Sequence, residues 1–286
     1  MRVILCGKGG AALHALKIMI QNGDEVLVVP VNGDTGEDTW QFSLRKYCEE
    51  VSVRHILDRK IKINDTIRHL KAFNPDVLIS IQYDQIFSKE LLEGIGCPAY
   101  NFHYALLPNH RGVAPIPWAI IDGDTEVGVS IHAIVPGIDE GAIFGQEVVK
   151  VDASTTAGSA YEAVESACCK LFEDFYPFKN MPQPCEQDGP SQYHKKGDLD
   201  FSNLEVDWDR PAIDVHRWIR AMIFPPVQLP YFTVDGIKYE IYSIRPLIHA
   251  DENRPGEVIQ QFAWLMAMGT QDGVITLSAR RIDGTT

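Results

Sequence analysis

Short β-branched runs alternate along the first part of the chain with longer segments that carry apolar residues at helical spacing. Residues 2–6 form such a run, residues 11–22 have the helical spacing, and VLVVPV at residues 26–31 is too short and too β-branched for a helix. A glycine-rich turn separates the first run from the helical segment. The pattern predicts a strand, a turn, a helix and a second strand.

The same alternation continues to residue 81. It predicts helices over residues 39–51 and 64–73, a short strand at 53–57 and a buried strand at 77–81. Such alternation predicts an α/β fold, a Rossmann-like, mainly parallel sheet with helices on both faces. Because ligands of these sheets bind beyond the carboxyl ends of the strands, function is expected in the loops that follow them.

The middle of the chain contains two further strand-like runs and one long helical segment. Residues 131–135 and 145–151 are strand-like, and residues 155–175 have the spacing of a helix. Residues 177–197 are rich in proline and poor in apolar residues, which is typical of a linker or surface loop.

The last part of the chain predicts one helix and then hairpins. Residues 211–222 have helical spacing with proline in the first turn, and Asp-Gly pairs at 235–236 and 272–273 lie between β-prone runs. These signals predict a small, OB-like β domain. We expect three parts: a catalytic domain at 1–190, a linker with a helix at 191–230, and the β domain at 231–286.

The first predicted turn reads Gly7-Lys8-Gly9-Gly10. This G-x-G-G lacks the third glycine of a dinucleotide fingerprint, and no Asp or Glu clearly closes the second strand. Glycines still allow a tight turn with exposed backbone amides at a helix start, where Lys8 adds positive charge. We therefore expect a general anion site rather than a dinucleotide site.

Composition narrows the class of protein. The 286 residues carry a formal net charge of −13 and contain no block of four or more consecutive basic residues, which argues against broad binding of nucleic acid or anionic membranes. No run approaches the roughly 18 apolar residues of a membrane helix, and no secretion signal is visible. The six cysteines form no C-x-x-C pair, so buried free thiols in the cytoplasm are expected.

Polar groups suited to chemistry gather between residues 101 and 139. Asn101 and His103 are two residues apart, so they point to the same side of an extended segment. A stiff, proline-rich loop then carries His110 and Arg111, and a glycine-flanked turn offers the carboxylate of Asp139. An amide, an imidazole and a carboxylate suit acyl transfer, in which they stabilise an oxyanion and move a proton.

The remaining motifs limit the mechanism. No Ser or Cys lies in a nucleophile-elbow pattern, and the nine histidines form no metal motif such as H-E-x-x-H. A direct transfer to an external amine, with no metal and no covalent acyl-enzyme, therefore fits better. Local structural roles for Asn101, His103, Arg111 and Asp139 stay open on spacing alone.

The two stretches NFHYALLPNHRGVAPIPWAI and GVSIHAIVPGIDEGAI resemble the signature of the formyltransferases that use 10-formyltetrahydrofolate. That family includes methionyl-tRNA formyltransferases and sugar-nucleotide N-formyltransferases. The resemblance continues in VDWDRPAIDVHRWIRAMIFPP, PGEVI and GTQDGVITL, so it covers essentially the whole chain. At the start of the second stretch, Val127 to Ser130 and the preceding Glu126 depart from the Thr-Gly-Val-Thr commonly seen there.

The resemblance implies roles for named residues. It implies that Asn101 and His103 hold the tetrahedral oxyanion, and that His103, with Asp139 nearby, helps to take the proton released by the attacking amine. Further implied contacts lie in the loop SIQYDQIF, where Gln82, Tyr83 and Ile86 are candidates to cradle the pterin. The alternative is that Ile86 and the adjacent Phe87 are ordinary core residues.

The acceptor is predicted from charge and resemblance together. Transfer RNA needs a basic surface, which the sequence does not show, whereas a nucleotide-linked amino sugar needs a few cations and an apolar platform. Candidates for acceptor binding are Lys8, His110, Arg111, Arg220 and Phe224. We therefore favour an amino sugar linked to dTDP, UDP or GDP.

Other readings remain open at this stage. Methionyl-tRNA formyltransferase is the first alternative, followed by a formyltetrahydrofolate hydrolase and a non-catalytic nucleotide-binding module. The resemblance also implies a homodimer, with the C-terminal region as one candidate interface, and a role in bacterial surface polysaccharides such as O-antigen.

Overall fold

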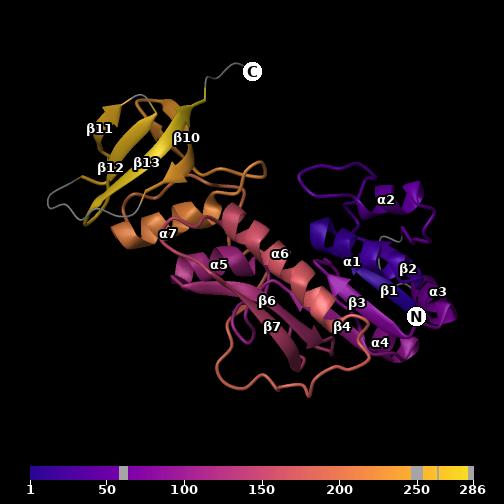
Figure 1. Cartoon of the computed structure of the whole chain (residues 1–286). Coiled ribbons are helices and arrows are strands. Elements are labelled where there is room, and N and C mark those ends of the chain that lie inside the picture. The colour runs from indigo at the N-terminus through magenta and orange to yellow at the C-terminus, as the bar shows by residue number, and fades with distance from the viewer. Residues whose placement is uncertain (58–63, 246–253, 263, 283–286) are drawn as a thin grey trace. The chain divides into compact units, whose positions relative to one another are not determined.

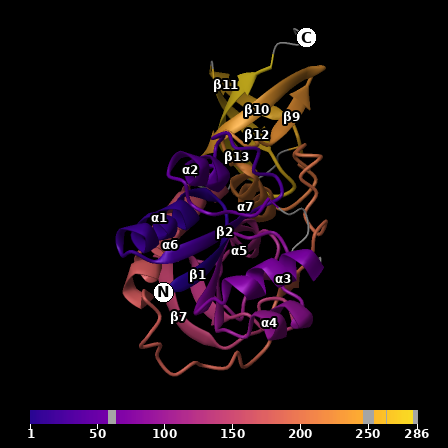
Figure 2. The ribbon, with the colours of Figure 1, turned by 90° about the vertical axis from the view of Figure 1, so that its right-hand side faces the viewer.

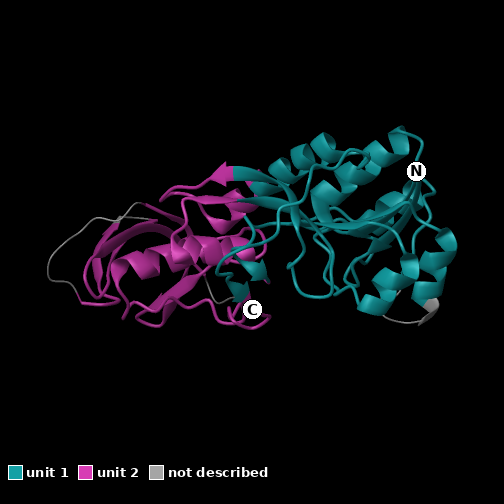
Figure 3. Cartoon of the chain, turned by 90° about the horizontal axis from the view of Figure 1, so that it is seen from below, with its two compact units in different colours: residues 1–112, 128–148, 164–193 teal, residues 113–127, 149–163, 194–286 magenta. Residues whose placement is uncertain are grey.

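The computed structural model describes residues 1–57, 64–245, 254–262 and 264–282. They form two compact units, coloured separately in Figure 3. Unit 1 consists of residues 1–112, 128–148 and 164–193, and unit 2 of the described residues within 113–127, 149–163 and 194–286. The chain passes between the units several times, so neither unit is one continuous stretch. The expected boundaries at residues 190 and 230 stay a prediction.

A six-stranded sheet forms the centre of unit 1 (Figure 1). Its spatial order is β2-β1-β3-β4-β6-β7. The strands are β1 (Arg2–Gly7), β2 (Glu25–Pro30), β3 (Val77–Ile81), β4 (Ala99–His103), β6 (Glu126–Ala133) and β7 (Ile143–Lys150). Strands β2, β1, β3 and β4 are parallel, whereas β6 runs antiparallel to β4. The mainly parallel sheet expected from the sequence is confirmed.

Helices cover both faces of this sheet. Helices α1 and α6 lie on one face, and α3 and α4 lie on the other (Figure 2). The helices up to residue 175 are α1 (Gly9–Gln21), α2 (Leu44–Glu50), α3 (Asn64–Phe73), α4 (Lys89–Ile95), α5 (Pro115–Asp122) and α6 (Ala157–Phe175). On the α3–α4 face, Leu70 of α3 and Leu91 of α4 pack in one buried cluster with Ile4 of β1. Removal of this apolar surface from water holds the layers together.

Helix α2 begins later than the expected helix over 39–51. Ser43 is its N-cap and accepts a hydrogen bond from the Lys46 N–H, and the Asp34 carboxylate accepts from the Arg45 N–H. Asp38 in turn accepts from the Ser43 N–H. Because these side chains accept hydrogen bonds from the backbone amides at the start of α2, the helix begins after Ser43 and residues 39–43 remain a loop. The expected strand at 53–57 is only a single bridge between Val28 and His55.

Unit 2 contains a five-stranded antiparallel sheet of order β11-β12-β13-β10-β9. The strands are β9 (Tyr231–Val234), β10 (Ile237–Ile244), β11 (Val258–Phe262), β12 (Leu265–Gly269) and β13 (Val274–Arg281), and helix α7 (Ala212–Met222) packs on it. Ile219 of α7 shares a buried cluster with Phe232 and Leu277 of the sheet. The expected hairpins β9–β10 and β12–β13 and the small β domain are confirmed.

A further pair of short strands lies in the segment expected to be a linker. Strand β5 (Arg111–Gly112) pairs with β8 (Tyr193–His194), and the Arg111 N–H donates to the Gln192 carbonyl at 2.9 Å. Residues 177–197 are therefore partly tied to the body of unit 1.

Two sequence expectations concern the whole chain. All six cysteines lie among the described residues and are free thiols. Cys6, Cys48 and Cys168 are buried, and Cys185 is exposed. Across the described ranges, no helix combines the length and the apolar character that a membrane crossing requires.

Candidate active site

The polar groups expected to carry chemistry lie at the end of β4. Asn101 and His103 are two residues apart on this strand, so they share one face of the sheet. The antiparallel register places His132 of β6 opposite Asn101 and Ser130 opposite His103. Cross-strand partners lie on the same face. The register therefore adds a second histidine, His132, to the pair found from the sequence.

Asp139 reaches this face from the turn that follows β6. The turn folds back closely, since a Cβ at Gly141 would lie 1.9 Å from the Ala133 carbonyl oxygen. Asp139 itself has a φ of +55°, in the left-handed region. Its Oδ2 accepts a hydrogen bond from the Gly112 N–H at 3.0 Å. The close packing and this bond fix the direction of the carboxylate.

Asp139 is the common partner of the three other polar side chains. Its Oδ1 lies 3.4 Å from the amide nitrogen of Asn101 and 3.4 Å from Nε2 of His132. Its Oδ2 lies 3.6 Å from Nδ1 of His103. The structure thus brings together the predicted Asn101, His103 and Asp139, with His132 among them.

Hydrogen bonds to carbonyls assign the ring protons. Nε2 of His103 lies 3.0 Å from the His110 carbonyl oxygen, so this nitrogen carries a hydrogen and donates it. In the neutral ring the lone pair is then on Nδ1, the nitrogen nearest Asp139. Nδ1 of His132 lies 2.8 Å from the Ala133 carbonyl oxygen, and by the same argument its Nε2 accepts from the Asn101 amide at 3.1 Å.

Electrostatics keep His103 neutral and Asp139 charged. Burial lowers the pKa of His103 below its usual 6.5, although the Asp139 charge opposes this shift. Burial raises the pKa of Asp139, but the positive charge of His103 and His132 when they are protonated, together with the hydrogen bond from the Gly112 N–H, brings it down to about 2. At neutral pH the site therefore offers a free lone pair on His103 Nδ1 beside a carboxylate.

The predicted pterin loop follows β3, the neighbour of β4. In the parallel register Ile81 lies beside Phe102, so Gln82 begins this loop at the level of His103. Tyr83 is half-buried against Phe87, with ring centroids 5.6 Å apart, whereas Ile86 is 53% exposed. An exposed apolar side chain in this loop fits an apolar ligand wall. Contacts of Gln82, Tyr83 and Ile86 with a folate stay a prediction.

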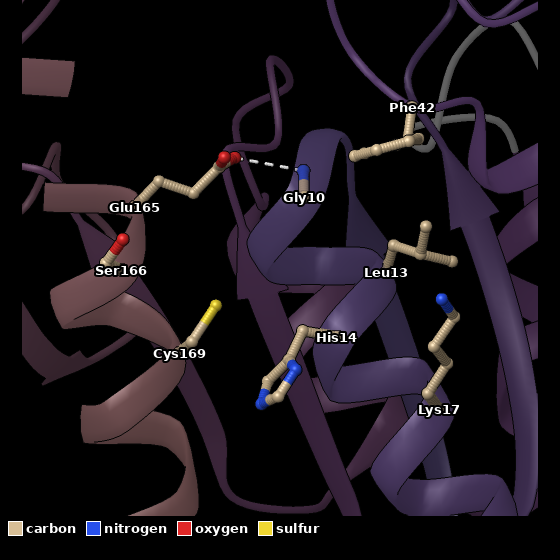
Figure 4. A pocket seen from close by; sticks show the side chains of 8 residues that line it. All are labelled: Gly10, Leu13, His14, Lys17, Phe42, Glu165, Ser166 and Cys169. Atoms are coloured by element: carbon tan, nitrogen blue, oxygen red, sulfur yellow. Dashed lines mark hydrogen bonds between the residues drawn. The ribbon is translucent and has the colours of Figure 1, made fainter. Parts of the chain in front are cut away.

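The amides expected to form an anion site hold the chain's own carboxylate instead. Figure 4 shows Glu165 of α6 reaching the start of α1, where its Oε1 accepts from the Gly10 N–H at 2.9 Å and lies 3.4 Å from the Ala11 nitrogen. A Cβ at Gly10 would lie 2.8 Å from this carboxylate. The expectation of an open anion site at these amides is therefore wrong. Lys8 precedes α1 as its N-cap and makes no side-chain capping bond within the described residues.

Two predicted acceptor residues make specific contacts within unit 1. Nε and Nη2 of Arg111 donate to Gln187 Oε1 at 3.0 and 2.7 Å, and Nη1 donates to Ser191 Oγ at 3.3 Å. His110 is buried, and its carbonyl accepts the bond from His103. Binding of the acceptor by either residue stays a prediction.

Two more of the residues predicted to bind the acceptor, Arg220 and Phe224, lie in unit 2. Arg220 is buried, and its Nη1 donates to the Asp152 carbonyl at 2.8 Å and to the Thr155 carbonyl at 3.0 Å. The ring of Phe224 lies 5.3 Å from that of Tyr161. These contacts fit structural roles. Acceptor binding by Arg220 and Phe224 stays a prediction.

Comparison with known families decides which kind of protein carries this site. A family model described as formyl transferase matches residues 4–174, and a second, described as formyl transferase, C-terminal domain, matches residues 199–285. The chain belongs to the formyl transferase family. The first match contains all four members of the polar cluster, and the resemblance seen in the sequence is confirmed.

Relatives of this formyl transferase differ in their named acceptors. A methionyl-tRNA formyltransferase of Agathobacter rectalis is 26% identical over 299 residues, which cover 99% of this chain and 93% of the relative. Among solved structures, the sugar 3N-formyl transferase WlaRD, with dTDP and 5-N-formyl-THF, gives a TM-score of 0.77 at 23% identity and covers 100% of this chain and 99% of its own.

A second solved structure gives the same result for the fold. The N-formyltransferase of Helicobacter canadensis, with folinic acid and dTDP-3-aminofucose, gives a TM-score of 0.76 at 23% identity. The match covers 98% of this chain and 99% of that one. At these identities the likeness establishes the fold of this formyl transferase.

Proposed function

We propose that this formyl transferase moves the formyl group of 10-formyltetrahydrofolate to the amino group of a nucleotide-linked amino deoxy sugar. The observation that carries the proposal is the cluster of Asn101, His103 and Asp139 at the end of β4. A donor amide, a neutral imidazole and a fixed carboxylate are the groups that attack of an amine on a formyl carbon requires.

The chemical step assigns one task to each side chain. The amine nitrogen attacks the formyl carbon, and negative charge develops on the formyl oxygen. Asn101 donates a hydrogen bond to that oxygen. Nδ1 of His103 takes the proton that the amine loses, since Nε2 already donates to the His110 carbonyl. Asp139 stabilises the imidazolium that forms. Collapse of the intermediate breaks the bond between the formyl carbon and N10 of the folate, and the imidazolium returns its proton to this nitrogen as tetrahydrofolate leaves.

The position of the loop after β3 supports the folate part of the proposal. Gln82, Tyr83 and Ile86 follow the strand next to β4, and neighbouring strands lie about 5 Å apart. A pterin against this loop would hold its formyl group near Asn101 and His103. The two solved structures described above each hold a folate ligand, 5-N-formyl-THF or folinic acid.

Charge supports the amino-sugar part. The net charge is −13, and the loop between β2 and α2 contains Asp34, Glu37 and Asp38 but no lysine or arginine. Such a loop repels a polyanion, whereas a single diphosphate needs only one or two cations. Lys8 is one candidate, because it follows β1 at the same edge of the sheet. Both solved structures described above also carry dTDP or a dTDP-amino sugar.

The second candidate function is methionyl-tRNA formyl transfer, which the names of the sequence relatives favour. A formyltetrahydrofolate hydrolase would use water in place of the amine. A homodimer, a cytoplasmic location and a place in O-antigen synthesis stay predictions.

The test incubates the protein with 10-formyltetrahydrofolate and a panel of dTDP-, UDP- and GDP-linked amino sugars. Mass spectrometry of the sugar and absorbance of the released folate are followed together. The proposal predicts that one sugar gains a formyl group in step with folate release. Folate release without any formylated sugar would indicate hydrolysis and overturn the proposal.

A further inference from the structure

The segment 185–192 contacts the Asp139 turn, and it belongs to the stretch that the sequence indicated to be a linker or surface loop. It begins with a backbone pair in which Cys185 and Ile143 exchange two hydrogen bonds, each of 2.8 Å. It ends where the Gln192 carbonyl accepts from the Arg111 N–H. Because backbone hydrogen bonds hold both ends of this segment, the backbone position from which the Gln187 side chain extends is fixed.

Gln187 joins the Asp139 turn to Arg111. Its Nε2 donates to the carbonyl oxygens of Asp139 at 2.8 Å and Gly141 at 2.7 Å. Its Oε1 accepts from Nε and Nη2 of Arg111 at 3.0 and 2.7 Å. A carboxamide has two donor hydrogens and two acceptor lone pairs. All four are used, so the side chain has one orientation.

The backbone conformation of the Asp139 turn depends on contacts from the surrounding residues. Asp139 has a φ of +55°, which disfavours a residue with a side chain and is maintained only by surrounding contacts. Gly112 holds the side-chain oxygen Oδ2 from one direction, and Gln187 holds the backbone carbonyl from another. Together they fix both ends of the aspartate.

We propose that Gln187 is a positioning residue that, held by Arg111, sets the Asp139 carboxylate against His103. Arg111 then acts on catalysis through Gln187, and not by direct contact with the phosphates of the acceptor. This inference rests on the proposed formyl transfer and adds two residues, Gln187 and Arg111, to the control of that reaction. Displacement of a catalytic group by about 1 Å typically costs about a hundredfold in rate.

The decisive variant is Gln187→Glu. Glutamate retains an oxygen that accepts from Arg111, but it has no hydrogens to donate to the two carbonyls. We expect kcat to fall by roughly ten- to hundredfold, as in Gln187→Ala, with the KM of the acceptor changed by less than about threefold. A Gln187→Glu variant with the kcat of the unmodified protein would overturn the proposal. Gln21→Ala, an exposed change at the end of α1, is the matched control.

A double-mutant cycle tests the role of Arg111. If Arg111 acts through Gln187, the double variant Arg111→Ala/Gln187→Ala loses no more kcat than either single variant. If Arg111 instead binds phosphate, Arg111→Ala raises the acceptor KM, and its effect adds to that of Gln187→Ala. This additive result would also overturn the proposal. Arg111→Lys, a milder change, serves if Arg111→Ala lowers the melting temperature sharply.

A measurement that does not depend on catalysis distinguishes the positioning role of Gln187 from the proposed function. His103 faces Asp139, His132 and His110, and the Asp139 charge raises its pKa. NMR titration of the His103 ring should therefore give a lower pKa in Gln187→Ala, which adds no charge, than in the unmodified protein. An unchanged titration overturns the positioning role. A protein that formylates none of the acceptors, yet shows this shift, would overturn the proposed function alone.

Discussion

The amide nitrogen of Asn101 lies 3.1 Å from Nε2 of His132, its direct partner across the β4–β6 ladder. The same nitrogen lies 3.4 Å from Asp139 Oδ1. The shorter contact holds one amide hydrogen on His132. The other hydrogen makes only the longer contact with Asp139, so it is the one assigned to the formyl oxygen. His132 therefore orients the amide that we assign to the oxyanion.

Replacement of His132 by phenylalanine tests this orientation. His132→Phe keeps a ring in the buried site and removes the acceptor for Asn101. One lost hydrogen bond costs about 1 kcal/mol, which corresponds to roughly a fivefold to tenfold decrease in kcat. Steady-state kinetics with the amino acceptor that the protein formylates measure the change. His69→Phe, an exposed change on α3, should have no effect, and an equal decrease in both variants would contradict the role of His132.

Asn101→Ala and His103→Asn test the central pair. Each should lower kcat by about a hundred- to a thousandfold, since each removes one group that acts on the transition state. Binding of the folate, followed by calorimetry, should remain within a few-fold of that of the unmodified protein. A near-normal kcat in either variant would remove that residue from the mechanism.

The protonation of His103 gives a pH prediction. Burial lowers the pKa of His103 below 6.5, and the Asp139 charge partly opposes the shift. The ring therefore stays neutral to a lower pH than an exposed histidine. In Asp139→Asn the opposing charge is absent, so the pKa should fall further. NMR titration of the ring checks both expectations. A rise of the pKa in Asp139→Asn would show that Asp139 does not act on His103 as described.

The sequence predicted β1, β2 and β3, because their apolar runs are almost wholly buried. Resemblance of its motifs to a known family also assigned Asn101, His103 and Asp139 to one site. The sequence did not identify His132 as part of the site, although the motif GVSIHAIVPGID contains it. The reason is that the partner of Asn101 depends on the register of β4 with β6. A register is a tertiary property that local spacing does not contain.

The glycine turn and Gln187 show a second limit of sequence reasoning. Glu165 is 155 residues away from Gly10, and Gln187 is 48 residues away from Asp139. Polar contacts across such separations leave no periodic signal. Proline-rich composition correctly indicated irregular backbone at 177–197, but it did not indicate that one glutamine there holds the catalytic turn.

His216 of α7 gives a prediction for stability. It is buried, its Nε2 donates to the Arg245 carbonyl, and burial together with the charge of Arg220 lowers its pKa to about 4. The unfolded chain takes up this proton near pH 6.5, whereas the folded chain does so only near pH 4. Stability should therefore fall as the pH falls through this window.

The comparison for His216 is the variant His216→Gln. Glutamine retains a donor for the Arg245 carbonyl but does not titrate. The unfolding midpoint in urea should fall less between pH 7 and about pH 4.5 in this variant than in the unmodified protein. Equal pH dependence in the two proteins would contradict the assignment of a buried neutral histidine.

A competition between the two acceptors tests the account most directly. The protein is incubated with 10-formyltetrahydrofolate, a dTDP-linked amino sugar and initiator methionyl-tRNA at equal concentrations, and both products are quantified by mass spectrometry. The account predicts formylated sugar, no formylmethionine, and loss of the product in His103→Asn. Formylmethionine without formylated sugar would contradict it.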